Sequence, residues 1–157
     1  MTDHLFTEIN LKALILKRLL ETIDEKASII KNEIQLAIET RDNETKSNVG
    51  DKFETTREMM QLEIEKNVLQ LNKYKLQKNE LLKININKTC KNVEPGSLVF
   101  TAENTYFFSI GIGKIEIENE TVFCISLISP IGKTLQNKKA GEKINFQGKE
   151  ISILKIT

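Results

Sequence analysis

The chain has no tryptophan, and its other aromatic residues are seven phenylalanines and two tyrosines among 157 residues. So few aromatic side chains argue against a platform on which nucleic-acid bases stack. Charge of one sign is also lacking, because the formal net charge is only +1. No overall field therefore marks the protein as a nucleic-acid binder.

Cysteine and histidine are equally scarce. Cys90 and Cys124 lie in different segments without metal-type spacing, which favours reduced thiols in a cytosolic protein over a disulfide. His4 is the only histidine, and at a terminus expected to fray it can anchor neither a Ser-His-Asp nor a Cys-His arrangement. There is no glycine-rich phosphate loop either, and self-contained catalysis is not expected.

Long hydrophobic runs are absent as well. No stretch is apolar for long enough to span a membrane, and residues 11–20 are interrupted by Lys12, Lys17 and Arg18. The first residues lack a signal-peptide pattern. We therefore expect a cytoplasmic protein without a membrane partner.

Residues 4–40 contain neither glycine nor proline, and their apolar residues repeat every seven positions. Two such rows, offset by four and sustained over four heptads, predict a coiled-coil helix. The first row is Ile9, Leu16, Ile23, Ile30 and Ala37, and the second is Ala13, Leu20, Ala27 and Ile34.

The pattern fails over residues 41–51, which are polar and contain Gly50, the only glycine of the first ninety residues. A second helix is predicted from Asp51 to Ile84, with Asn67 and Lys78 where apolar residues would be expected. A short loop makes the two helices antiparallel, and each would be about 50 Å long. The apolar residues of the second helix are Met60, Ile64, Leu71, Tyr74 and Leu81, with Leu62, Leu69 and Leu76 on a neighbouring row.

The predicted fold class is α+β, with a helical hairpin at residues 1–84, a polar linker at 85–94 and a small antiparallel β domain at 95–157. Strands are expected at 97–101, 106–112, 114–117, 122–128, 143–146 and 150–156, with a helical turn at 134–139. The expected core is apolar and alternates along these strands: Val99, Phe108, Ile110, Phe123, Ile125, Leu127, Leu135, Ile144, Phe146, Ile151, Ile153 and Ile156.

One motif in the β domain is specific. It consists of Ser129-Pro130 before an apolar-Gly pair, then Leu135, Lys138-Lys139 and Gly141-Glu142 before a strand. This stretch resembles the C-terminal domain of the bacterial GreA/GreB transcription elongation factors, which is FKBP-like. Asn137 stands where that family usually has glycine, and Asn tolerates the left-handed conformation that such a turn needs.

The resemblance extends to the layout, because Gre factors also place a helical hairpin before this domain. At the hairpin tip, Gly50-Asp51-Lys52-Phe53-Glu54 reproduces the family's Gly-Asp-x-x-Glu, and the next residues depart from it. The resemblance implies that Asp51 and Glu54 are lent to RNA polymerase, where they help to hold a second Mg²⁺ and position a water. No Mg²⁺ would be bound by this chain alone.

The spacing of Asp51 and Glu54 has a simpler interpretation. An acidic residue at a helix start with Glu three positions later is a capping box in form, and the two roles do not exclude each other. Asp42 and Glu44 are further carboxylates of the loop, and we expect them to be solvated turn residues.

The resemblance also implies that the β domain helps to attach the factor to RNA polymerase. Lys133, Lys138, Lys139 and Lys143 form a basic cluster that would suit an acidic partner surface, although solvated lysines are the simpler interpretation. The partner-binding residues expected here are Ser129, Pro130, Lys133, Lys138 and Lys139.

These expectations define a non-enzymatic elongation factor that stimulates the polymerase's own cleavage of backtracked transcripts and meets the nascent RNA 3′ end only indirectly. We expect a monomer. A polymerase channel-binding regulator that does not stimulate cleavage is the first alternative. The second is a coiled-coil adaptor that dimerises through its hairpin, and the third, resting on fold analogy alone, is a prolyl isomerase.

Overall fold

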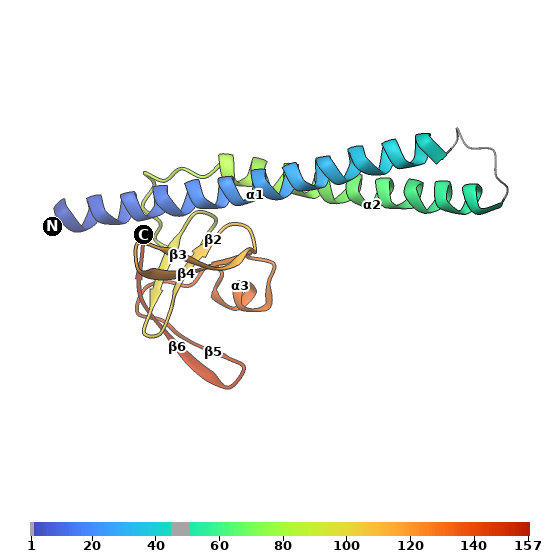
Figure 1. Cartoon of the computed structure of the whole chain (residues 1–157). Coiled ribbons are helices and arrows are strands. Elements are labelled where there is room, and N and C mark those ends of the chain that lie inside the picture. The colour runs from blue at the N-terminus through green and yellow to red at the C-terminus, as the bar shows by residue number, and fades with distance from the viewer. Residues whose placement is uncertain (1, 45–50) are drawn as a thin grey trace. The chain divides into compact units, whose positions relative to one another are not determined.

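The computed structural model describes residues 2–44 and 51–157, with side chains from 7–43 and 54–157, and its fold is α+β. Two long helices, α1 (Thr2–Glu44) and α2 (Asp51–Leu82), form an N-terminal hairpin. A mostly antiparallel sheet of six strands follows (Figure 1). The predicted hairpin and β domain are thereby confirmed at this level. The expected loop was too long, because residues 41–44 belong to α1.

The chain divides into two compact units, and the boundary between them falls within both α1 and α2. Residues 20–79 form the hairpin unit, and residues 2–19 join residues 80–157 in the other, here called the sheet unit. The first turns of α1 are therefore part of the sheet unit. The expected linker also contributes to it, since Cys90 and Val93 are buried.

Within the hairpin unit, the predicted seam is found. Ile23, Ala37 and Ile64 are buried, and the intervening residues Ala27, Ile30, Ile34, Leu71 and Tyr74 are partly buried. The two polar interruptions have different surroundings. The Lys78 ammonium lies 2.6 Å from the Asp24 carboxylate, whereas Asn67 is buried, and its side-chain nitrogen has no hydrogen-bond partner among the described residues.

One predicted row of α2 does not join the seam. Leu62, Leu69 and Leu76 are between 65% and 71% exposed. Because they recur at intervals of seven, they form a single apolar stripe along the outside of the helix.

The burial pattern of α1 changes in the sheet unit. Ile15 and Leu19 are fully buried, while Leu16, which the heptad assigned to the seam, is only partly buried. The heptad did not predict the full burial of Ile15 and Leu19. This part of the helix belongs to a different compact unit, so a different face is covered.

The sheet has the strand order β3-β4-β2-β1-β6-β5. Its strands are β1 (Leu98–Thr101), β2 (Thr105–Phe108), β3 (Gly113–Ile117), β4 (Glu120–Ile125), β5 (Lys143–Phe146) and β6 (Lys149–Ile156). All neighbours are antiparallel except β2 and β4, which are parallel. The second and fourth strands end earlier than predicted, and Gln147 and Gly148 both have positive φ in the β5–β6 turn, as a type I′ hairpin requires.

The short helix α3 (Pro130–Leu135) lies earlier in the chain than the helical turn predicted at 134–139. Pro130, expected as a partner-binding residue, is the first residue of this helix. Proline at the first position of a helix loses nothing, because the amide it lacks has no acceptor there.

One face of the sheet carries the predicted core. Val99, Phe108, Leu135, Ile144, Ile153 and Ile156 are buried in one cluster, and most of the remaining predicted residues pack against it. The opposite face is buried too, at Leu98, Phe107, Val122 and Cys124. No helix in the described part of the chain has the length and apolar character needed to cross a membrane.

Candidate functional site

The Ser-Pro motif builds the start of α3. The Ser129 hydroxyl accepts a hydrogen bond from the Gly132 amide at 3.1 Å and donates one to the Ser126 carbonyl at 2.6 Å. Ser129 is thus the N-cap, with Pro130 next to it at the first helical position. Two of the five predicted partner-binding residues, Ser129 and Pro130, therefore form the start of α3, and Pro130 is exposed.

The turn after α3 confirms the expectation for Asn137, whose φ is +64°. Its amide donates to the Val93 carbonyl at 3.0 Å, and the Val93 amide donates to the Lys138 carbonyl at 2.9 Å. This exchange ties the segment before β1 to the turn that carries the lysines.

The basic cluster is a surface feature of this turn and of β5. Lys133, Lys139 and Lys143 are exposed, whereas Lys138 is partly buried. The Lys143 ammonium lies 3.0 Å from the Glu150 carboxylate, and the Lys139 amide donates to the Glu142 carboxylate at 2.5 Å. Two carboxylates therefore lie among these lysines and weaken their field.

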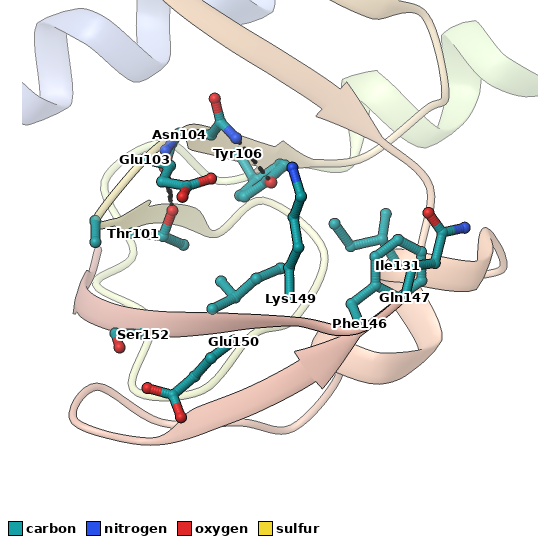
Figure 2. Close-up of a pocket in the computed structure, with 12 residues that line it drawn as sticks. Thr101, Glu103, Asn104, Tyr106, Ile131, Phe146, Gln147, Lys149, Glu150 and Ser152 are labelled. Carbon is teal, nitrogen blue, oxygen red and sulfur yellow. Dashed lines mark hydrogen bonds between the residues drawn. The ribbon is translucent and has the colours of Figure 1, made fainter.

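Beside the cluster lies a half-open pocket of about 290 Å³ between α3, the β1–β2 turn and the β5–β6 hairpin (Figure 2). Tyr106, Ile131, Phe146 and Ile151 form its apolar lining. Its polar lining includes Glu103 and Lys149, and Lys149 extends across the pocket toward Tyr106 (Figure 2).

The predicted catalytic and metal residues lie at the start of α2. Asp51 is the first residue of the helix, but its side chain lies outside the described part, as do residues 45–50. Glu54, one turn along, is exposed. Whether Asp51 caps the helix or faces a partner therefore stays a prediction.

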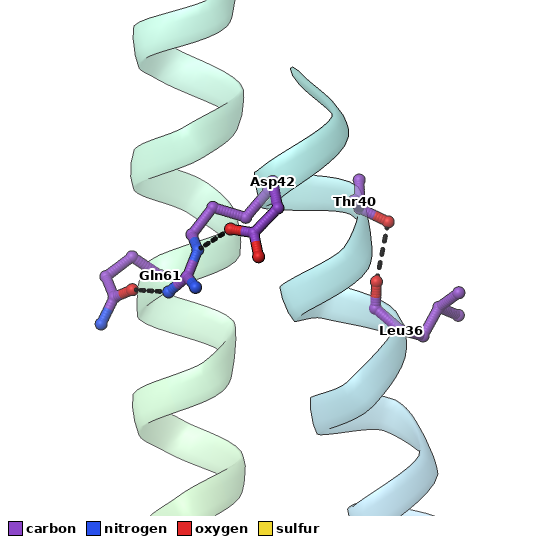
Figure 3. Close-up of polar contacts among 5 residues, drawn as sticks. Leu36, Thr40, Asp42 and Gln61 are labelled. Atoms are coloured by element: carbon purple, nitrogen blue, oxygen red, sulfur yellow. Dashed lines mark hydrogen bonds and ion pairs between the residues drawn. The ribbon is translucent and has the colours of Figure 1, made fainter. Parts of the chain in front are cut away.

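Farther along α2, a polar network links Gln61 to the last turns of α1 (Figure 3). The Arg41 guanidinium donates to the Gln61 amide oxygen of α2 at 2.7 Å and lies 3.1 Å from the Asp42 carboxylate. The Thr40 hydroxyl donates to the Leu36 carbonyl at 2.9 Å. Arg41 thus links the two helices near the tip and places a positive charge at the C-terminal end of α1, which favours the helix. Asp42 is helical and paired here, not a turn residue.

Among the residues that the structure describes, no group of three or more His, Cys, Asp or Glu side chains could hold a metal ion. An exposed carboxylate such as Glu54 is a hard oxygen ligand of the kind that Mg²⁺ accepts. Such a ligand fits an ion whose other ligands come from a second protein.

A buried lysine, Lys12, joins α1 to the segment before β1. Lys12 is only 1% exposed, and its ammonium donates to the Lys88 carbonyl at 3.2 Å. The Lys88 ammonium in turn lies 2.6 Å from the Glu94 carboxylate. Burial lowers the pKa of Lys12, whereas the nearby Cys90, Glu8 and Glu94 act in the opposite direction.

The two thiols are protected by the same kind of burial. It raises the pKa of Cys90, with a hydrogen bond to Glu94 adding to the effect. Burial also raises the pKa of Cys124 to about 12. Both are free thiols held in their unreactive protonated form, so neither is a nucleophile at neutral pH.

Neither the pocket nor the burial of Lys12 was predicted from the sequence. The pocket residues come from three separate segments, and no motif connects them. The available signal for the buried lysine was its position within an apolar stretch, where Lys12 was interpreted only as an interruption.

No family model, curated protein or solved structure matches this chain.

Proposed function

We propose that this protein is an RNA polymerase-binding transcription elongation factor of the GreA/GreB kind, acting in the cytoplasm. The hairpin would enter the secondary channel of the polymerase, and the β domain, FKBP-like in this proposal, would attach beside it. The activity would be stimulation of the polymerase's own cleavage of backtracked transcripts.

One observation carries the proposal: α2 begins at Asp51, and Glu54 is exposed one turn later at the free end of a coiled-coil hairpin. Residues three apart in the first turn of a helix lie on one face. The Arg41–Gln61 bond supports the proposal further, because it links the last turns of α1 to α2 ten residues after Asp51.

The chemistry needs little from the protein itself. A second Mg²⁺ at a phosphodiester is held by oxygen ligands, and it supplies charge stabilisation and an activated water. Asp51 and Glu54 would add carboxylates to those of the polymerase, and the rigid hairpin would fix their position. This division of labour explains how a chain without catalytic groups of its own could affect hydrolysis.

The test is transcript cleavage in backtracked elongation complexes of the polymerase from the same organism. We expect the native protein to stimulate cleavage and Asp51→Ala or Glu54→Ala to reduce it at least about 10-fold, since metal-held charge contributes several kcal/mol. Glu58→Ala is the matched control, because Glu58 is an exposed carboxylate one turn farther along α2.

Binding must be measured in the same samples. Stimulation lost in the two variants, with polymerase affinity and the Glu58→Ala control unchanged, would support the proposal. Binding without stimulation by the native protein would instead indicate a channel-binding regulator, and absence of binding would overturn the polymerase proposal as a whole.

The apolar stripe of Leu62, Leu69 and Leu76 favours a second candidate, a coiled-coil adaptor that dimerises. Sedimentation equilibrium separates the two candidates, because the elongation factor should have the 18.0 kDa mass of one chain. A doubled mass that returns to 18.0 kDa in Leu69→Lys would favour the adaptor. A single-chain mass at all concentrations would contradict it.

A further inference from the structure

Strand β6 is longer than its pairing with β1. On one edge, its residues 149–152 pair with β5. On the other edge, pairing with β1 begins only at Ile153, preceded by one bond from the Ala102 amide to the Ser152 carbonyl at 3.3 Å. Within the part of the chain that the structure describes, residues 149–151 therefore have no strand partner on the β1 side.

The end of β1 explains this open edge. A bulge lies between Phe100 and Thr101, and the chain then turns away toward β2. The Thr101 hydroxyl closes the turn by donating to the Asn104 carbonyl at 2.8 Å and accepting from the Asn104 amide at 3.0 Å. Bulges commonly redirect a strand beside a functional site. Here the turn and the open edge form opposite walls of the pocket (Figure 2).

The lining of the pocket is partly apolar, and it includes the Tyr106 hydroxyl as a hydrogen-bond donor. Tyr106 is 7% exposed, and its hydroxyl oxygen accepts a hydrogen bond from the Asn104 side chain at 3.3 Å. No acceptor for the Tyr106 hydroxyl hydrogen is found among the described residues. A ligand carbonyl in the pocket could accept it, while Ile131, Phe146 and Ile151 contact an apolar side chain.

The charges of the pocket identify the kind of ligand. Glu103 and Lys149 are both exposed lining residues, and Glu150 is already paired with Lys143 at 3.0 Å. Carboxylates beside the site would repel a phosphate backbone. A neutral main chain, which both donates and accepts hydrogen bonds, suits this mixed lining.

We propose that this pocket is a peptide-binding site. An extended peptide segment lies along residues 149–151 of β6, adds main-chain hydrogen bonds to the open edge, and inserts one apolar side chain among Tyr106, Phe146 and Ile151. Strand addition of this type takes its affinity from the main chain and its specificity from pockets for alternate side chains. The site lies wholly in the sheet unit and is independent of the role proposed for the hairpin tip.

The test uses a phage-displayed library of random 12-residue peptides, panned on the full chain. We expect enriched peptides to share an apolar residue and to shift the NMR signals of Tyr106, Ile131 and Ile151. Tyr106→Phe should weaken binding about 5-fold, the value of one hydrogen bond. Leu154→Ser is the matched control, because Leu154 is 63% exposed on the same strand outside the pocket, and it should bind normally.

Synthetic versions of the enriched peptides test the main-chain contacts without altering the protein. Methylation of single peptide nitrogens should weaken binding at alternate positions only, because alternate amides face the same edge of a strand. Three results would each overturn the proposal: no enrichment, binding unaffected by every N-methyl group, or stronger binding of a dT12 oligonucleotide to the same residues.

Discussion

Replacing Gly132 by alanine is expected to destabilise the sheet unit by about 3 kcal/mol and lower its melting temperature by about 10 °C. A Cβ atom at this position would lie 2.1 Å from the Ser126 carbonyl oxygen and 2.9 Å from the Leu127 Cα. Both are backbone atoms, so no side chain can rotate away to make room.

The surroundings make the clash costly. The same Ser126 carbonyl accepts the Ser129 hydroxyl at 2.6 Å, and the Ser129 oxygen itself would be 2.9 Å from the added carbon. Moving α3 outward would break this cap and withdraw Leu135 from the core cluster. Overpacking against backbone costs more than against side chains because interiors are close-packed.

Gly111→Ala is the matched control for this prediction. A Cβ atom there would meet Ser126 only at 3.8 Å, an ordinary contact. Urea denaturation in a Tyr74→Phe background measures both variants, because Tyr106 is then the only tyrosine and there is no tryptophan. A loss of stability in Gly132→Ala no larger than in Gly111→Ala would contradict the proposed close approach.

Shortening Lys12 to alanine is expected to cost the sheet unit about 2–3 kcal/mol. Its side chain is almost fully buried, so truncation leaves a cavity, and the Lys88 carbonyl loses the donor that lies 3.2 Å away. The Lys88 carbonyl, whose bond to Lys12 is partly buried, adds to the cost of the cavity when it is left without this donor.

Lys12→Met separates the packing of the stem from the charge. Methionine fills similar space without an ammonium group to desolvate. Like alanine, it cannot donate to the Lys88 carbonyl, but we expect the avoided desolvation to offset this loss, so that the variant is at least as stable as the native protein at neutral pH. The Tyr74→Phe background and urea denaturation serve here as well. A loss in Lys12→Met as large as in Lys12→Ala would show that the charge, not the stem, holds α1 in place.

The stability of the native protein is expected to depend on pH through the charge of Lys12. Burial lowers the pKa of Lys12 below 10.5, the value taken for the unfolded chain. Between the two values the unfolded state binds more protons, so native stability rises with pH in that window. Glu8, Glu94, Lys88 and Cys90 are the charged or titratable groups that act on Lys12.

Lys12→Met lacks this rise, so the amount by which its free energy of unfolding exceeds that of the native protein should shrink as pH increases. Measurements from about pH 7 to about pH 9.5 avoid most tyrosine ionisation and compare the two proteins at each point. A difference that stays constant, or widens with pH, would contradict a lowered Lys12 pKa.

Local patterns in the sequence determined most elements of the fold. The seam of Ile23, Ile30 and Ala37 was predictable because heptad spacing places these residues on one helix face whatever surrounds them. The left-handed turn at Asn137 was expected from the resemblance to the Gre motif, and Asn137 does have a φ of +64°. For the candidate site, the sequence located the two tip residues as a helix start, and α2 does begin at Asp51.

Tertiary structure decided what depends on residues distant in the chain. The shift of the buried face of α1 to Ile15 and Leu19 follows from membership of the sheet unit, which no heptad encodes. The pocket exists because a bulge ends β1 while β6 continues, and the exposure of Leu69 depends on which face its neighbours cover. Periodicity specifies the faces of an element, but burial is a property of the packed whole, so only the tertiary structure could assign it.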